Sequence, residues 1–117
     1  MLKILNLKNI KMCSINNKFF AKNNRLITTS KYKNFKKLVA ENVKCDAVFT
    51  KDIEIKIKMS CYIDLDAPIK AIIDGIEASG CIANDRFITS LTVIKTPIKR
   101  GQPESLEVWI GDMNELQ

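Results

Sequence analysis

Apolar and polar residues alternate most regularly between residues 53 and 63. Apolar side chains occupy every second position of this segment: Ile53, Ile55, Ile57, Met59, Cys61 and Ile63. Successive side chains of a β-strand point to opposite faces, so a period of two predicts a strand with one face in the core and the other in water.

Two segments instead repeat their apolar residues at helical spacing. Residues 30–43 carry Phe35, Leu38, Val39 and Val43 on one face, and Ser30 is a suitable N-cap. The second segment, residues 67–79, has four isoleucines at i, i+3, i+4 and i+7: Ile69, Ile72, Ile73 and Ile76. Both segments are predicted to be helices.

The ends of the second helix have their own signals. Asp66 stands where an N-cap belongs, Pro68 fits the first turn, and Gly80 provides a stop. The helix is therefore expected to run from about Ala67 to Ser79.

The rest of the chain predicts further strands. Residues 4–12 alternate loosely, and residues 87–98 and 105–110 read as two strands joined by the turn region "KRGQPE". Between residues 13 and 29, the turn-forming "KNN" suggests a hairpin or an ordered loop. We expect a single α+β domain over residues 1–117, with a mixed sheet of about four strands and two helices.

Length and composition exclude several classes of protein. No apolar run approaches the roughly 20 residues that cross a bilayer, and the N-terminus does not resemble a secretory signal, so a cytoplasmic protein is expected. The chain has no histidine, which excludes Ser-His and Cys-His nucleophile schemes. Its four cysteines are widely spaced: Cys13, Cys45, Cys61 and Cys81. This spacing argues against zinc and favours free thiols that are buried or half-buried.

The net charge of +6 is divided unevenly along the chain. Residues 1–60 contain 14 Lys and Arg against 4 Asp and Glu, whereas residues 61–117 contain 5 against 9. This division fits either a solvated lysine face or a polyanion that docks on the basic half, opposite a small acidic cluster.

The stretch "DLDAPIKAIIDG", residues 64–75, carries the candidate chemistry. Asp64 and Asp66 are two residues apart, so in extended chain they point to the same side, and Lys70 follows one helical turn after Asp66. Asp85 precedes the next strand and reaches this pair only if the topology brings the loop back. Asp66 could be a helix cap and Asp64 a solvated strand end; alternatively, three carboxylates suit a hard cation such as Mg²⁺.

The same stretch resembles the RusA family of Holliday-junction endonucleases. The family signature is D-L-D-N-x-x-K at the start of a helix, a D-A-L turn of that helix, and an acidic pair fifteen residues after the lysine. This chain has "DLDAPIK", "IIDGI" and "ANDRFI" at these places. "CSINNKFF" is similar to the family's N-terminal segment, and "VIKTPIKRGQPESLEVWI" to its last two strands, so the resemblance covers nearly the whole chain.

The resemblance implies a function and a set of site residues. Asp64, Asp66 and Asp85 would bind Mg²⁺, with Mn²⁺ as an alternative, and Lys70 would stabilise charge near the scissile phosphate. The protein would be a homodimer, encoded by a bacterium or a phage, that resolves four-way DNA junctions by paired symmetric nicks. In the N-terminal loop, four residues are candidate DNA contacts: Asn16, Lys18, Lys22 and Arg25.

The chain also departs from the family pattern. Ala67 replaces the usual asparagine, Asn84 replaces the first acid of the pair, and the family's arginine-rich run before the D-L-D is missing. Asp74 is either an i, i+4 partner that positions Lys70 or plain surface charge. Two alternatives to the nuclease remain: a non-catalytic nucleic-acid-binding protein of the same fold, and a small basic protein-interaction module.

Overall fold

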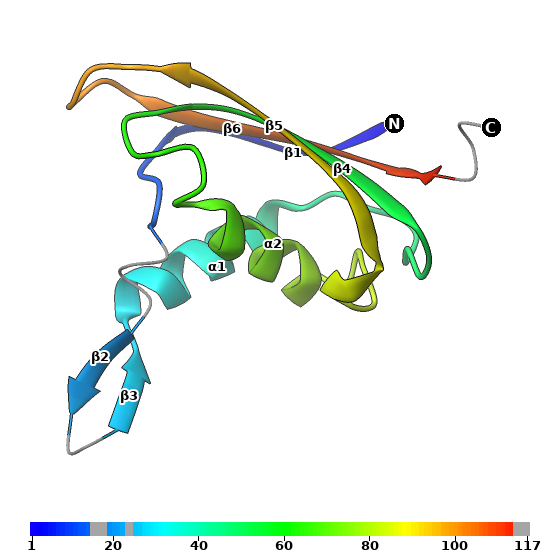
Figure 1. Cartoon of the computed structure of the whole chain (residues 1–117), viewed down its shortest axis with the longest axis horizontal. Helices are drawn as coiled ribbons and strands as arrows, with labels where there is room; N and C mark the ends of the chain where they lie inside the picture. The colour runs from blue at the N-terminus through cyan, green and yellow to red at the C-terminus, as the bar shows by residue number, and fades with distance from the viewer. Residues whose placement is uncertain (15–18, 23–24, 114–117) are drawn as a thin grey trace.

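Four strands form one mixed sheet, in the order β1-β6-β4-β5 (Figure 1). The computed structural model describes residues 1–14, 19–22 and 25–113, and for residues 19–22 and 25–28 only the backbone. The strands of the sheet are β1 (Leu2–Ile10), β4 (Ile53–Cys61), β5 (Ile88–Pro97) and β6 (Glu104–Asp112). β6 pairs antiparallel with β1 and β4, whereas β5 pairs parallel with β4. The predicted α+β domain with a mixed sheet of four strands and two helices is confirmed.

The alternating segment forms the central part of the core. In β4, the side chains of Ile53, Ile55 and Ile57 are fully buried, whereas the residues between them are half-buried or exposed. The neighbouring strand β6 buries a matching set: Leu106, Val108 and Ile110. The predicted buried and solvent-facing sides of β4 are therefore confirmed.

Two helices cover the same face of the sheet, as Figure 1 shows, and pack against each other. They are α1 (Ser30–Asn42) and α2 (Ile69–Ala78). α1 buries Tyr32, Phe35 and Val39. α2 buries Ala71, Ile72, Gly75 and Ile76. No helix of the described ranges is both long enough and apolar enough to cross a membrane.

The helix starts differ from the predicted ones. The N-cap of α1 is Thr29, whose Oγ1 accepts a hydrogen bond from the amide of Tyr32 at 3.2 Å, so Ser30 is the first helical residue. α2 begins at Ile69 rather than Ala67, and its N-cap residue is Pro68, which has no side-chain group that could cap the helix. A turn over residues 65–68 precedes it, so Asp66 contributes only its carbonyl oxygen to the amide of Ile69. The predicted capping role of the Asp66 carboxylate is wrong, whereas Gly80, at φ 84°, follows the end of α2 as predicted.

Of the hairpin and the ordered loop that the sequence suggested around "KNN", the structure has the hairpin. β2 (Phe19–Lys22) and β3 (Arg25–Thr28) pair antiparallel as a separate two-stranded sheet. Figure 1 shows this hairpin projecting from the N-terminal end of α1, away from the four-stranded sheet.

The cysteines correct the expectation of free thiols. Cys13 and Cys61 are free and buried, but Cys45 and Cys81 form a disulfide. Each of these two residues lies three positions after the last residue of a helix, α1 or α2, and their Cα atoms are 5.8 Å apart. Because 36 residues separate them, no local motif signals the pair, and only the packing of the two helix ends brings them together.

Removing this disulfide should destabilise the fold. Closing a loop of this length restricts the unfolded chain, so the double variant Cys45→Ser/Cys81→Ser should lose about 4 kcal/mol of unfolding free energy. Urea unfolding followed by circular dichroism measures the loss. Dithiothreitol should lower the midpoint of the wild type and leave that of the variant unchanged. A wild-type midpoint that does not respond to dithiothreitol would contradict the bridge.

Candidate active site around Lys70

Lys70, in the first turn of α2, lies between two carboxylates from different parts of the chain. Its Nζ is 3.0 Å from Oδ1 of Asp74, one turn along the helix, and 3.2 Å from Oδ2 of Asp85. Of the two interpretations of Asp74, the i, i+4 partner of Lys70 is thus the one that the structure supports. The pKa of the Lys70 ammonium is raised, mainly by its hydrogen bond to Asp74, against a smaller opposing effect of burial and with further support from Asp85. Lys70 is therefore a cation throughout the neutral pH range.

Asp74 is itself held by the other helix. Its Oδ2 accepts a hydrogen bond from the hydroxyl of Tyr32 in α1. Tyr32 is 2% exposed, and its pKa is raised by burial and by the hydrogen bond to Asp74, so the phenol stays protonated and donates. The buried Tyr32 hydroxyl on α1 thus orients the Asp74 carboxylate, and Asp74 in turn orients Lys70.

Asp85 is positioned by a short helical turn. It is the first residue of the 3-10 helix η2 (Asp85–Phe87), whose N-cap Asn84 accepts a hydrogen bond from the amide of Arg86 at 3.0 Å. The Asp85 amide donates to Oε2 of Glu77 on α2 at 2.7 Å. Asn84, which replaces the first acid of the family pair, therefore serves as the cap of this turn.

Asp64 and Asp66 do not join this cluster. Both are exposed and lie between the end of β4 and the start of α2. Among the described residues, no group of three His, Cys, Asp or Glu side chains is close enough together to hold a metal ion. The three predicted carboxylates are thus not brought together around one point among the described residues, and Mg²⁺ binding stays a prediction.

The strand register explains this separation. β4 and β5 pair in parallel from Ile53 opposite Ile88 to Cys61 opposite Pro97. Asp64 follows the last residue of β4, whereas Asp85 precedes the first residue of β5. The backbone therefore presents the two acids at opposite ends of this strand pair. Of the three predicted metal ligands, Asp85 is the one that forms an ion pair with Lys70.

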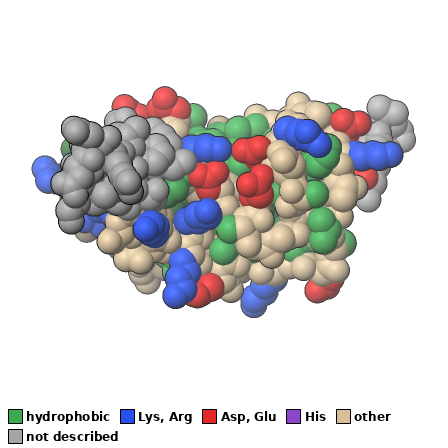
Figure 2. Space-filling view, turned by 90° about the horizontal axis from the view of Figure 1, so that it is seen from below, with side chains coloured by type: hydrophobic (Ala, Val, Ile, Leu, Met, Phe, Trp, Pro, Cys, Tyr) green, Lys and Arg blue, Asp and Glu red, His purple; other side chains and the backbone are tan. Residues whose placement is uncertain are grey.

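The candidate DNA contacts of the N-terminal loop are largely untested by the structure. Asn16 and Lys18 lie outside the described residues, and only the backbone of Lys22 and Arg25 is described, at the closing pair of the hairpin. Figure 2 looks at the molecule from the helix side and shows acidic and basic side chains interspersed on the described part of this face.

Sequence reasoning missed Tyr32 and Glu77. Tyr32 lies on the apolar face of the predicted first helix, where an aromatic residue is normally assigned to packing. Glu77 lies seven residues after Lys70, which places both on one face of α2, and this spacing was a usable signal.

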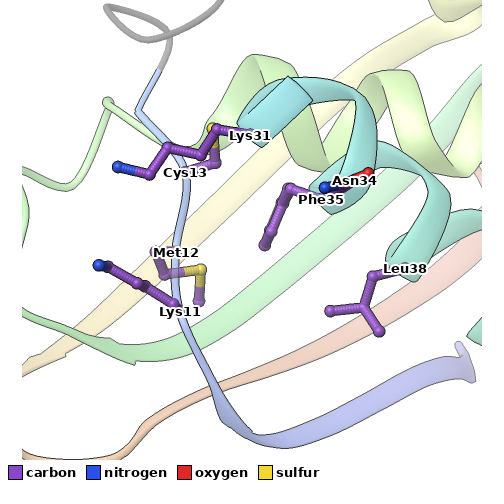
Figure 3. Close-up of a pocket in the computed structure, with 7 residues that line it drawn as sticks. All are labelled: Lys11, Met12, Cys13, Lys31, Asn34, Phe35 and Leu38. Atoms are coloured by element: carbon purple, nitrogen blue, oxygen red, sulfur yellow. The ribbon is translucent and has the colours of Figure 1, made fainter. Parts of the chain in front are cut away.

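Two cavities open beside the residues that follow β1. The first, of about 280 Å³, lies between residues 11–13 and α1. Figure 3 shows its walls, with Phe35 and Leu38 from α1 and the Lys11 and Lys31 side chains extending in the same direction, away from Leu38. The thiol of Cys13 in its wall has a pKa raised by burial, so it is not an activated nucleophile. The second cavity shares Lys11 and Met12 with the first.

Fold and site together define a small α+β domain with a lysine–carboxylate cluster on its second helix. No protein-family model matches the chain, and no curated protein matches it.

Proposed function

We propose that this protein is a Mg²⁺-dependent, structure-selective endodeoxyribonuclease that resolves four-way DNA junctions, as the RusA-like motif implies. The observation that carries the proposal is the 3.2 Å contact between Lys70 and Asp85. These two residues occupy the lysine and second-acid positions of the motif, fifteen residues apart, and they belong to different elements of the fold. A motif whose distant members meet in space is stronger support than the same letters in sequence alone.

Lys70 has the properties of a group that stabilises a phosphate. Its ammonium is charged at neutral pH and its side chain is half exposed, at 47%, so a phosphodiester oxygen can reach it. The carboxylates on either side fix its direction, and such preorganised charge is an effective way to stabilise a transition state. Mg²⁺ enters the proposal through the motif alone, because Asp64, Asp66 and Asp85 are not assembled around one point.

We extend the proposal to a homodimer, because paired symmetric nicks require two sites on one junction. A closed dimer with twofold symmetry would match the symmetry of a four-way junction. The partner of the chain is then branched DNA.

The test compares a synthetic four-way junction with a linear duplex of the same sequence. We expect paired nicks in the junction in the presence of Mg²⁺, none with EDTA and none in the duplex. The variant Asp66→Asn, which keeps the shape of the side chain and removes its charge, should bind the junction and fail to cut it. Absence of cutting by the wild type with either Mg²⁺ or Mn²⁺ would refute the nuclease.

A non-catalytic junction-binding protein is the second candidate, and the arrangement of the carboxylates favours it. With Asp64 and Asp66 apart from Asp85, the fold could keep a cationic Lys70 for phosphate contact without supporting catalysis. The same assay separates the two functions: tight, salt-sensitive junction binding without nicks identifies the binding protein.

A further inference from the structure

We propose that the second cavity, beside the end of β4, binds one unpaired nucleotide of a DNA strand. This inference rests on the proposed function, because it assigns part of the DNA path to a site that the motif does not include. The cavity has a volume of about 420 Å³, which falls in the range of sites that enclose a small ligand.

Three distant segments form the walls of this cavity. They are the end of β1 with the residues after it, the residues that follow β4, and the turn between β5 and β6. The residues that line the cavity include Lys11, Met12, Tyr62, Ile63 and Arg100, together with the carboxylate of Glu104.

One carboxylate holds two of these segments to β6. Oε1 of Glu104 accepts a hydrogen bond from the amide of Met12 at 2.9 Å, and Oε2 accepts one from the amide of Tyr62 at 3.0 Å. The third wall is braced by Gln102, whose side-chain oxygen accepts from the amide of Lys99 at 2.7 Å. The cavity is thus formed in the free protein, which reduces the entropy cost of binding a ligand there.

The side chains at its rim match the two parts of a nucleotide. Lys11 and Arg100 are exposed cations that can contact a phosphate, and Arg100 can do so with two parallel hydrogen bonds. Tyr62 exposes 54% of its surface, an unusual fraction for an aromatic residue, and offers a ring on which a base can stack. Met12 and Ile63 contribute apolar side chains to the lining.

The position of the cavity relates it to the proposed cleavage motif. Tyr62 is two residues before Asp64 in the chain, so a base on Tyr62 would lie close to the segment that carries Asp64 and Asp66. A base inside a duplex is stacked on both sides and cannot enter, whereas an unpaired base can enter at low cost. The cavity therefore favours DNA with unpaired nucleotides, as at the centre of a branch.

Fluorescence anisotropy with a labelled single strand of twelve thymidines tests the cavity. Because base stacking on an aromatic ring contributes about tenfold to affinity, Tyr62→Ala should weaken binding by about tenfold, and Tyr62→Phe should retain it. Arg100→Gln should weaken binding and lower the salt dependence, with a slope smaller by about 0.7. Lys51→Gln is the matched control, because it removes the same charge just before β4, at the opposite end of the strand, and should bind as the wild type does.

A second measurement locates the contact directly. Ultraviolet crosslinking of the same strand carrying 5-iodouracil at its centre should attach the base to the peptide that contains Tyr62. Wild-type affinity in Tyr62→Ala, or a crosslink confined to another peptide, would overturn the proposal. If the wild type cuts or binds the four-way junction and does not bind the single strand, the nucleotide site in the cavity is ruled out and the proposed function is unaffected. A wild type that binds neither DNA would remove both.

Discussion

Replacing Gly75 by alanine is expected to lower the free energy of unfolding by about 2–3 kcal/mol, although alanine is the better helix former. Gly75 is buried in α2 where that helix meets α1. A Cβ atom at this position would lie 2.6 Å from both Cβ and Cγ1 of Val39, and 3.1 Å from the carbonyl oxygen of Lys36. Rotation of the Val39 side chain moves neither its Cβ nor the backbone oxygen, so the helices must move apart. Urea unfolding should show a lower midpoint with an unchanged slope.

Gly111→Ala is the matched control for this substitution. The three atoms nearest to a Cβ there all belong to Met1, with Cγ closest at 3.3 Å, and this chain-terminal side chain can move. We expect Gly111→Ala to change the unfolding free energy by less than about 0.5 kcal/mol. If Gly75→Ala were as stable as the wild type, the two helices would not approach each other as closely as described.

The elements that could be predicted are those whose signal is local. The alternation in β4 and the helical spacing in α2 follow from burying one face of each element, and both hold in the structure. The start of α2 could not be predicted correctly because Asp66 and Pro68 are equally compatible with a turn that precedes the helix. Whether Asp66 and Pro68 belong to the helix or to a preceding turn depends on the path of the chain after β4.

The parts that could not be predicted depend on contacts between distant residues. The Cys45–Cys81 disulfide requires the two helix ends to meet, and the Tyr32–Asp74 hydrogen bond requires α1 to cross α2 at Asp74. No local pattern in the sequence determines where α1 crosses α2. For the same reason, spacing alone could place Asp64, Asp66 and Asp85 together, whereas the parallel pairing of β4 and β5 keeps them apart.

The second large effect is expected at Lys70. We expect Lys70→Gln to lower the rate of junction cleavage by about a hundredfold or more, which is the usual cost of removing one preorganised group that stabilises transition-state charge. The glutamine cannot carry the positive charge that Asp74 and Asp85 direct into the site. Single-turnover cleavage at saturating protein isolates this step, and gel-shift affinity for the same junction should change far less than the rate.

The dependence of Lys70 on pH follows from its partners. Its pKa is raised above the ordinary value of 10.5, so the stability that its ion pairs provide is fully present below pH 10.5 and is lost only as the pH rises through the higher folded value. Cleavage should therefore show no loss between pH 7 and pH 9 that is attributable to this lysine, and Lys70→Arg should keep part of the activity.

Lys37→Gln is the control for charge. Lys37 forms an i, i+4 pair with Glu41 on the exposed side of α1, at 3.7 Å, so the substitution removes the same charge from a comparable pair outside the site. We expect cleavage by this variant to equal that of the wild type. Equal rates for Lys70→Gln and Lys37→Gln would mean that Lys70 only stabilises the contact between α2 and η2. A loss of cleavage in Lys70→Gln that Lys37→Gln does not share would instead place the Lys70 cation at the phosphodiester.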